Sequence, residues 1–519
     1  MTSTLRDTFE PPDTTVRRRR RWWNRIVLAV VVVLLGSAAV VVGDTLVRTC
    51  GQLGSGVAMV DGECIGVTDG SYLFRQDYRD VESRIAEENT WVASEMSKPG
   101  DKSVVTVALF LPMTVEDDSP TSPEEVRNQM EGAYTAQRRL NRAPIAGDPN
   151  PLIRLVLANQ GNRQQQWELV VEQLADMRDD QAPLVAVIGL GVSVEETERA
   201  AERLAEYNIP MVATLATADA LNYETYPGFT RVAPSNHDQV KALRQYLDQK
   251  ELTSAVLVED TNQDLFVESM RANFTVLLRD LIEPPSATFK GVSTPTDATA
   301  GIFEPAVSRI CEAQPRPQVV LFAGRKIDLR SFLKSLEARS CSTETITVVT
   351  VGSDTGALST TGEPELQEPA LREANIVVAV AATADPQRWK AGQANPPESF
   401  SKFFMAFQNH FDVEHLADGE AILTYDALLT AARAIRLAAA SKPQQDEFVP
   451  SSADVGSQLT NLNTGRSISG AGGTLSFSTR GTDGRETGNP CGKPVPILES
   501  PSGPPVEPVF ITCSDNITG

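Results

Sequence analysis

The sequence predicts an α/β protein in which two doubly wound parallel-sheet lobes follow an N-terminal transmembrane helix. From Ser103 onward, apolar segments of strand length alternate with amphipathic segments of helix length. Strands that are apolar on both faces and separated by helices are typical of parallel sheets covered by helices. The alternation is too long for one sheet and is interrupted at residues 226–234. We therefore expect two lobes.

Residues 26–43 form the predicted transmembrane helix, because they include no charged side chain and consist mainly of Val, Leu and Ala. A helix of this length rises about 27 Å, close to the thickness of the hydrocarbon layer. Residues 1–25 include a run of arginines and two adjacent tryptophans, which indicates a cytoplasmic arm. The chain is thus predicted to cross the cell membrane once, with everything after residue 43 outside.

The membrane segment has two interpretations, an uncleaved signal anchor or a cleaved signal peptide. Its apolar run is long for a signal peptide, and the small residues 36–39 lie in the middle of the run rather than at its end. The anchor is the preferred interpretation.

The charge of the chain is divided between its two ends. Residues 1–25 hold seven arginines and three acidic residues, so the remainder holds 40 basic (47 − 7) and 65 acidic (68 − 3) residues, a net charge of −25. A surface this acidic repels nucleic acid. We expect an exported protein without a nucleic-acid partner.

The six cysteines are even in number, and a chain facing an oxidising compartment is expected to pair them. Pairing each cysteine with its nearest neighbour joins Cys50 to Cys64, Cys311 to Cys341, and Cys491 to Cys513, although other connectivities are possible. No CxxC motif is present, so we predict neither a redox motif nor a thiolate zinc site. No cofactor is expected.

Elements are expected in the following order. Residues 44–102 are predicted to form a membrane-proximal collar, a Gly-rich loop or hairpin followed by an amphipathic helix over residues 78–96. Ser122, Pro123 and Glu125 predict the capped start of a helix that ends near residue 140. Strands are predicted at residues 104–112, 153–159, 183–191, 209–215, 254–260, 318–324 and 346–354, with helices between them. Residues 470–477 predict a hairpin, and the Pro-rich residues 490–508 an irregular flap.

These elements are assigned to domains by their order. The first lobe is expected to comprise residues 103–228 and 376–445, and the second lobe residues 229–375. Residues 446–519 are expected to complete the second lobe and to form the flap closed by Cys491 and Cys513.

Ligands of open parallel sheets bind at the carboxyl ends of the strands. There, Gly189 and Gly191 precede Ser193, which would either bind a ligand anion at a helix N-terminus or form a capping box with Glu196. The segment IPMVATLATADAL, residues 209–221, starts as an apolar strand and ends in small side chains with hydroxyl groups. Such residues suit a cleft, although Thr217 could instead cap the following turn.

Several segments together resemble the type I periplasmic solute-binding family, which includes the branched-chain amino-acid binding proteins of ABC transporters. They are AVIGLGVSVEETERAAERLAEYNIPMVATLATADAL, FTRVAPSNHDQVKALRQYL, SAVLVEDTNQDLFVESM, QVVLFAGRKIDLRSFLKSL and ILTYDALLTAARAI, within residues 103–485. The resemblance implies two lobes that close on a small ligand. It implies that Ser193 and the loop of Leu215, Ala216 and Thr217 hold a carboxylate, and that Asp354 holds an ammonium. Asp354 could instead cap the turn in SDTG.

The sequence departs from the family's pattern at three places. Asp264 and Leu265 replace a Tyr-Gly pair, Arg325 and Lys326 replace an aromatic residue, and Asn159 replaces an acid. Arg325 is therefore a further candidate ligand residue, and the departures indicate either a different, more acidic ligand or no small ligand at all. If Arg325 and Lys326 face solvent, they carry no such information.

The predicted fold also gives the pairing of Cys311 with Cys341 a reason. Both cysteines lie near the ends of helices that flank the strand QVVLFAG, and consecutive helix ends of a βαβ unit lie on one edge of the sheet, opposite the ligand.

The sequence does not predict an enzyme. His410 and His415 are five residues apart, a spacing that does not place them on one helix face and that we interpret as a solvated helix end. P-loop, zincin, nucleophile-elbow and dinucleotide motifs are absent from the sequence. We predict a membrane-anchored extracytoplasmic protein that captures a small polar, amino-acid-like solute for an ABC-type permease or for sensing. The alternative is a degenerate ectodomain that docks another protein of the cell envelope.

Overall fold

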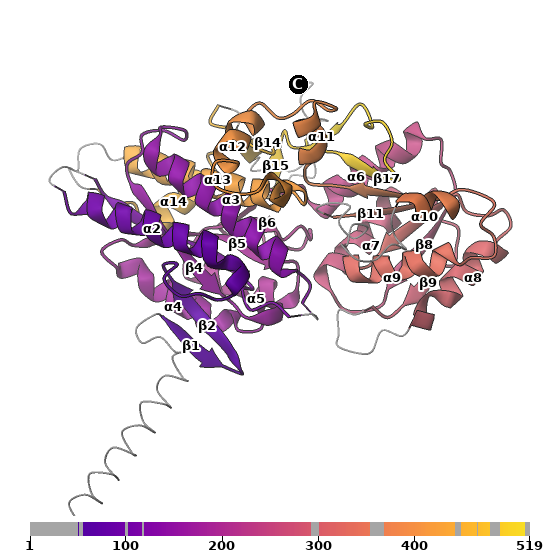
Figure 1. The fold of residues 1–519 in the computed structure, drawn as a ribbon, viewed down its shortest axis with the longest axis horizontal. Coiled ribbons are helices and arrows are strands. Elements are labelled where there is room, and N and C mark those ends of the chain that lie inside the picture. Colours follow the sequence, from indigo (N-terminus) through magenta and orange to yellow (C-terminus); the bar gives the residue numbers. More distant parts are fainter. Residues whose placement is uncertain are drawn as a thin grey trace, which may run out of the picture.

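The computed structural model describes residue 50 and residues 56–98, 102–116, 119–291, 300–352, 368–441, 448–463, 465–477 and 488–513. Within these ranges the chain forms two α/β lobes side by side (Figure 1). The predicted cytoplasmic arm and transmembrane helix, residues 1–25 and 26–43, lie outside the described residues, as does Asp354. Across the described ranges, no helix is both long enough and apolar enough to span a bilayer.

The first lobe is built on a seven-stranded sheet. In order across the sheet its strands are β1 (Val57–Val60), β2 (Glu63–Thr68), β4 (Leu152–Asn159), β3 (Val104–Leu111), β5 (Leu184–Val192), β6 (Met211–Leu215) and β7 (Phe229–Arg231). Strands β3 to β7 run parallel to one another, whereas β1 and β2 form an antiparallel edge. Alternate side chains of β3 enter the cores on opposite faces of the sheet, Leu109 on one face and Phe110 on the other. This burial explains why the strand is continuously apolar.

Helices cover both faces of the first sheet. They are α2 (Arg79–Met96), α3 (Pro123–Arg142), α4 (Trp167–Asp176), α5 (Glu195–Glu206), α12 (Phe400–Phe407), α13 (Glu420–Ala440) and α14 (Ser452–Leu459). The capping box predicted for α3 is confirmed, with reciprocal bonds between Ser122 and Glu125. Helices α3 and α13 approach so closely that a Cβ at Gly132 would lie 2.1 Å from the Ala421 carbonyl oxygen.

The second lobe is built on a six-stranded sheet. In order across the sheet its strands are β17 (Ile497–Ser500), β12 (Ile376–Ala381), β11 (Ile346–Val351), β10 (Val319–Ala323), β8 (Ala255–Asp260) and β9 (Ala287–Phe289). All pairs are parallel except that of β17 with β12. Its helices are α6 (Asn236–Gln249), α7 (Leu265–Leu277), α8 (Glu304–Glu312), α9 (Lys326–Glu337) and α10 (Glu368–Glu373). Apolar cores lie on both faces of this sheet as well.

The observed lobes differ from the predicted boundaries at three places. Residues 56–98 do not form a separate collar, because β2 pairs with β4 and Asn89 donates a hydrogen bond to the Leu155 carbonyl at 2.7 Å. Strand β12 belongs to the second sheet, since it continues the parallel order after β11, and the chain crosses to the first lobe only after residue 381. Helix α14 packs on α13 in the first lobe rather than completing the second lobe.

The C-terminal segment is more regular than the predicted flap. The hairpin of β13 (Ile468–Gly470) and β14 (Gly473–Phe477) is confirmed, and β15 (Pro490–Cys491) extends it. Strand β16 (Pro494–Val495) pairs with β18 (Phe510–Ile511), and α11 (Pro386–Ala391) follows the crossing from the second lobe. The Lys493 ammonium lies 3.0 Å from the Asp426 carboxylate, and both side chains are fully buried. This ion pair joins the C-terminal segment to α13.

All three predicted disulfides are present. The structure joins Cys50 to Cys64, Cys311 to Cys341 and Cys491 to Cys513, with Cα–Cα distances of 5.8, 5.4 and 5.1 Å. The first joins the segment before β1 to β2, the second joins α8 to the turn after α9, and the third closes the C-terminal segment.

Candidate functional site

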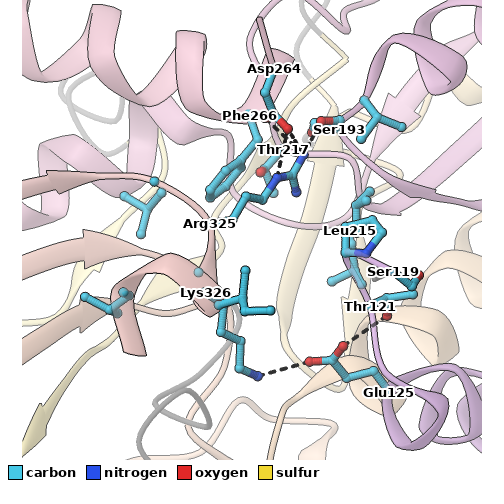
Figure 2. Close-up of a pocket in the computed structure, with 18 of the residues that line it drawn as sticks. Ser119, Thr121, Glu125, Ser193, Leu215, Thr217, Asp264, Phe266, Arg325 and Lys326 are labelled. Atoms are coloured by element: carbon cyan, nitrogen blue, oxygen red, sulfur yellow. Dashed lines mark hydrogen bonds and ion pairs between the residues drawn. The ribbon is translucent and has the colours of Figure 1, made fainter. Parts of the chain in front are cut away.

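A cavity of about 410 Å³ lies between the two lobes at the carboxyl ends of their parallel strands. The loops after β5 and β6 and the N-terminal part of α3 form one wall, and the loops after β8, β10 and β11 form the other. Figure 2 shows residues from both walls pointing toward one another. This is the position at which doubly wound folds bind ligands.

The wall from the first lobe includes three of the predicted ligand residues, Ser193, Leu215 and Thr217. Ser193 and Thr217 follow the neighbouring strands β5 and β6, so their loops meet, and the Ser193 hydroxyl oxygen accepts a hydrogen bond from the Ala218 amide at 3.0 Å. Ala216 is buried beside them but does not line the cavity as described; its carbonyl accepts a hydrogen bond from Arg231.

Arg231 fixes the shape of the loop after β6. Its guanidinium is fully buried and donates to the carbonyls of Ala216 at 2.7 Å, Ala218 at 3.0 Å and Leu221. Burial lowers the pKa of Arg231 to about 10. The guanidinium satisfies carbonyls that would otherwise be buried without donors, and the loop that presents Thr217 is therefore rigidly held.

The capping box predicted for Ser193 and Glu196 is absent. Val194 occupies the N-cap position of α5, and no side chain caps this helix. The glycines before it also have a structural reason, since a Cβ at Gly191 would lie 2.2 Å from the Gln164 side-chain oxygen. That oxygen accepts from the Val192 amide at 2.9 Å, so the close approach is made by the protein's own Gln164.

The wall from the second lobe is dominated by Arg325, whose side chain is 12% exposed. Its guanidinium forms bonds of 2.8 to 3.0 Å with both carboxylate oxygens of Asp264, and lies 5.0 Å from the centre of the Phe266 ring. Arg325 therefore does not face solvent. Two departures from the family's pattern, at positions 264 and 325, meet in one ion pair.

Two cations of the second lobe reach across the cavity. Arg325 donates to the Ser193 carbonyl at 2.7 Å, and the Lys326 ammonium lies 3.0 Å from the Glu125 carboxylate (Figure 2). Burial acts to raise the pKa of Glu125, but the nearby Lys326 charge and the hydrogen bonds from Ser122, Lys326 and Thr121 outweigh it and hold the pKa below its ordinary value. The two lobes are thus joined across the cavity by one hydrogen bond from a cation and one ion pair.

The inner part of the cavity contains polar residues that sequence reasoning missed. Gln239 and Thr383 are 1% and 2% exposed and line the cavity. Neither the Gln239 side-chain oxygen nor the Thr383 hydroxyl has a hydrogen-bond partner among the described residues. A buried polar atom left without a partner costs about 1–3 kcal/mol. No local pattern in the sequence distinguishes these two residues from structural ones.

The predicted residue Asp354 lies outside the described residues; its neighbour Gly352 lines the cavity. His410 lies just beyond the end of α12 and is partly exposed, whereas His415 lies in a one-turn helix, Val413–Leu416. They line a second hollow on the first lobe, where His415 lies 2.9 Å from the Glu131 carboxylate. Within the ranges that the structure describes, no group of histidine, cysteine and acidic side chains is arranged to hold a metal ion.

Solved structures with the same fold are solute-binding proteins. The branched-chain amino acid transporter substrate binding protein LivJ from Streptococcus pneumoniae, in complex with isoleucine, has a TM-score of 0.53 and 14% identity, and the match covers 79% of this chain and 99% of LivJ. A substrate-binding protein from Desulfitobacterium hafniense has a TM-score of 0.53 and 17% identity, with coverages of 76% and 97%. A solute binding protein from R. palustris in complex with benzoate has a TM-score of 0.53 and 16% identity, with coverages of 79% and 97%.

Curated protein sequences gave no match to this chain. The family model described as "Receptor family ligand binding region" matches residues 130–483, which is more than half of the chain. With this match and its two-lobed fold, the chain belongs to the type I periplasmic binding protein family.

Proposed function

We propose that this chain is a membrane-anchored, extracytoplasmic solute-binding protein that captures a small, amino-acid-like solute between its lobes. The main support is the cavity, which combines walls from both lobes with charged contacts that span them. A ligand held between two lobes favours the closed arrangement, because it contacts both walls only when they are together. The predicted helix at residues 26–43 supports the anchoring.

The ligand class is proposed from the polar residues of the wall and from the ligands named for the similar structures. Ser193 and Thr217 offer hydroxyl groups from neighbouring loops, as a carboxylate requires. Two of the similar structures are complexes with isoleucine and with benzoate, both of which carry a carboxylate. The occupied protein would then deliver the solute to an ABC-type permease or report it to another membrane partner.

One observation favours the second candidate, a degenerate ectodomain that docks an envelope protein. Arg325 and Lys326, two cations of the cavity, are already paired with Asp264 and Glu125. In this case the cavity would be held closed by its own side chains, and the outer surface would make the functional contact.

Thermal unfolding of the full-length protein in detergent, screened against the twenty amino acids, benzoate and sugars, separates the two candidates. We expect one class of small carboxylate to raise the unfolding temperature, because a ligand that binds only the folded state stabilises it. Absence of stabilisation by every solute, together with co-purification of a membrane protein, would reject solute capture.

A further inference from the structure

The orientation of the Gln239 side-chain amide determines which of its atoms is free to bind a ligand. The Gln239 side-chain nitrogen donates to the carbonyls of Gly352 at 3.0 Å and Ala381 at 2.8 Å, at the ends of β11 and β12. Both amide hydrogens are therefore used. A flipped amide would place its oxygen against two carbonyl oxygens, so the orientation is fixed.

This orientation leaves the oxygen of Gln239, a residue that lines the cavity, as the free acceptor of the side chain. The oxygen is buried and has no donor among the residues that the structure describes. Thr383 lies two residues after Ala381, whose carbonyl Gln239 binds, and its buried hydroxyl is unpartnered in the same described set. Glu420 lines the cavity as well and accepts a hydrogen bond from Gln129. Gln239 and Glu420 are thus acceptors among the residues that line the cavity, and Thr383 adds a hydroxyl.

We infer that Gln239 and Thr383 form a subsite for an N–H donor of the ligand, an ammonium or an amide. The inference rests on the proposed solute-binding function. A ligand carboxylate is excluded from this position, because its oxygens would face the lone pairs of the Gln239 oxygen. An N–H group satisfies the Gln239 oxygen and the Thr383 hydroxyl together. The ligand is thereby oriented, with its donor end inward and its carboxylate toward Ser193 and Thr217.

Isothermal titration of the full-length protein in detergent with three matched probes tests the subsite. The probes are L-leucine, 4-methylpentanoate, which is leucine without its ammonium, and 4-methylpentanamide, which replaces the carboxylate with an amide. We expect Thr383→Val to weaken binding of leucine or of the amide by about tenfold, the loss expected for one hydrogen bond to a charged or polar group. Binding of 4-methylpentanoate should change by less than about twofold. Which N–H probe is affected identifies the donor as ammonium or amide.

Thr383→Ser is the matched control, because it keeps the hydroxyl and should keep the affinity for the N–H probes. Gln239→Leu should weaken the same probes; if it fails to fold because the Gly352 and Ala381 carbonyls lose their donor, Thr383→Val decides alone. An equal loss for all three probes, or unchanged binding of the N–H probes, would overturn the subsite.

The wild-type protein separates failure of the subsite from failure of the proposed function. If it binds no solute at all, the proposed function fails and the subsite falls with it. If it binds only solutes without an N–H group, the function stands and the subsite is wrong. If another amino acid binds in place of leucine, that amino acid and its analogue without the amine take the places of leucine and 4-methylpentanoate.

Discussion

Arg325 and Asp264 occupy the N-cap positions of α9 and α7, which follow neighbouring strands of the second sheet, and they neutralise each other in the wall of the cavity. Asp264 precedes α7 and accepts a hydrogen bond from the Val267 amide, and Arg325 precedes α9. The strands before these helices, β8 and β10, are neighbours in the sheet, so their carboxyl ends lie side by side. The ion pair follows from this topology and extends to the first lobe through the Ser193 carbonyl.

Removing Arg325 should destabilise the protein strongly. The Asp264 side chain is 5% exposed, and Arg325→Ala would leave its charge buried without a countercharge, with only the hydrogen bond from the Val267 amide. Breaking a buried pair in this way costs about 3–5 kcal/mol. We expect a loss of about 3 kcal/mol in the free energy of unfolding, measured with urea.

Lys326→Ala is the comparison for Arg325→Ala, because the Lys326 side chain is 41% exposed and its partner Glu125, 15% exposed, keeps the hydrogen bonds from Thr121 and Ser122. Such pairs contribute about 0–1 kcal/mol. If the two variants lowered the free energy of unfolding equally, burial of the Arg325–Asp264 pair would have no energetic consequence.

Stability should fall with rising pH because of Glu82. Burial raises the pKa of this carboxyl to about 8, against an ordinary value of 4.5, and the hydrogen bond from the Phe74 amide and the nearby Arg79 only partly oppose the shift. Between these two values the folded state binds more protons than the unfolded state, so each pH unit should remove up to about 1.4 kcal/mol of stability.

Glu82→Gln tests this contribution, since glutamine keeps an oxygen for the Phe74 amide but does not titrate. The unfolding free energy of the wild type minus that of the variant should be lowest near pH 8. It should rise steadily as the pH is lowered to about 4.5. A difference that does not depend on pH across this interval would contradict the raised pKa.

Close packing of α3 on α13 should make Gly132 intolerant of substitution. In Gly132→Ala the new methyl group would lie 2.1 Å from the backbone oxygen of Ala421, a contact that requires the helices to move apart. Overpacking of this kind costs about 1–3 kcal/mol. Gly456→Ala, in α14, is the matched control, because the nearest atom there is 3.6 Å away. The two melting temperatures, measured by circular dichroism, should differ clearly.

The sequence predicts what depends on local pattern. Strands such as β3 and β10 are buried on both faces and are visible as apolar runs. Strands β7 and β9 have only three residues each and leave no such pattern. The lobe to which β12 belongs depends on its pairing with β11, which no local property of IVVAVA reveals.

The candidate site divides in the same way. Ser193 and Thr217 could be predicted because they end apolar strands. The pairing of Arg325 with Asp264 joins residues 61 apart in sequence and requires the order of strands in the sheet. Gln239 and Thr383 are ordinary polar residues in the sequence, and only the three-dimensional arrangement shows that their side-chain oxygens lack partners among the described residues.

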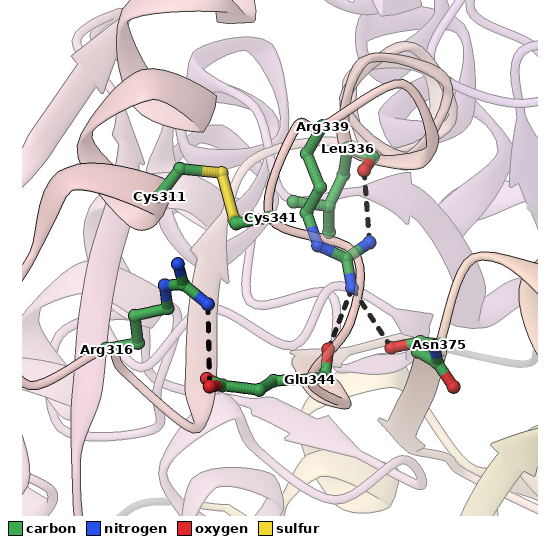
Figure 3. The surroundings of a disulfide bond; sticks show 7 residues. All are labelled: Cys311, Arg316, Leu336, Arg339, Cys341, Glu344 and Asn375. Carbon is green, nitrogen blue, oxygen red and sulfur yellow. Dashed lines mark hydrogen bonds and ion pairs between the residues drawn. A yellow bond between two sulfur atoms is a disulfide. The ribbon is translucent and has the colours of Figure 1, made fainter.

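The Cys311–Cys341 disulfide should stabilise the second lobe without affecting ligand binding. Helix α9 begins at Lys326, which lines the cavity, and ends at Glu337, about 18 Å farther along its axis. Figure 3 shows the disulfide at this far end, near Arg339, which donates to the carbonyls of Leu336, Glu344 and Asn375.

Replacing both cysteines with serine should lower the free energy of unfolding by about 2–4 kcal/mol, because the unfolded chain regains the entropy of the loop that the bond closes. The affinity for any solute that the wild-type protein binds should stay the same within about twofold, since a domain with a stability of about 5–15 kcal/mol remains mostly folded after a loss of this size. Urea unfolding measures the first quantity and isothermal titration the second. A fall in solute affinity in a variant that is fully folded would show that the disulfide end of α9 influences the cavity wall. This result would contradict the prediction.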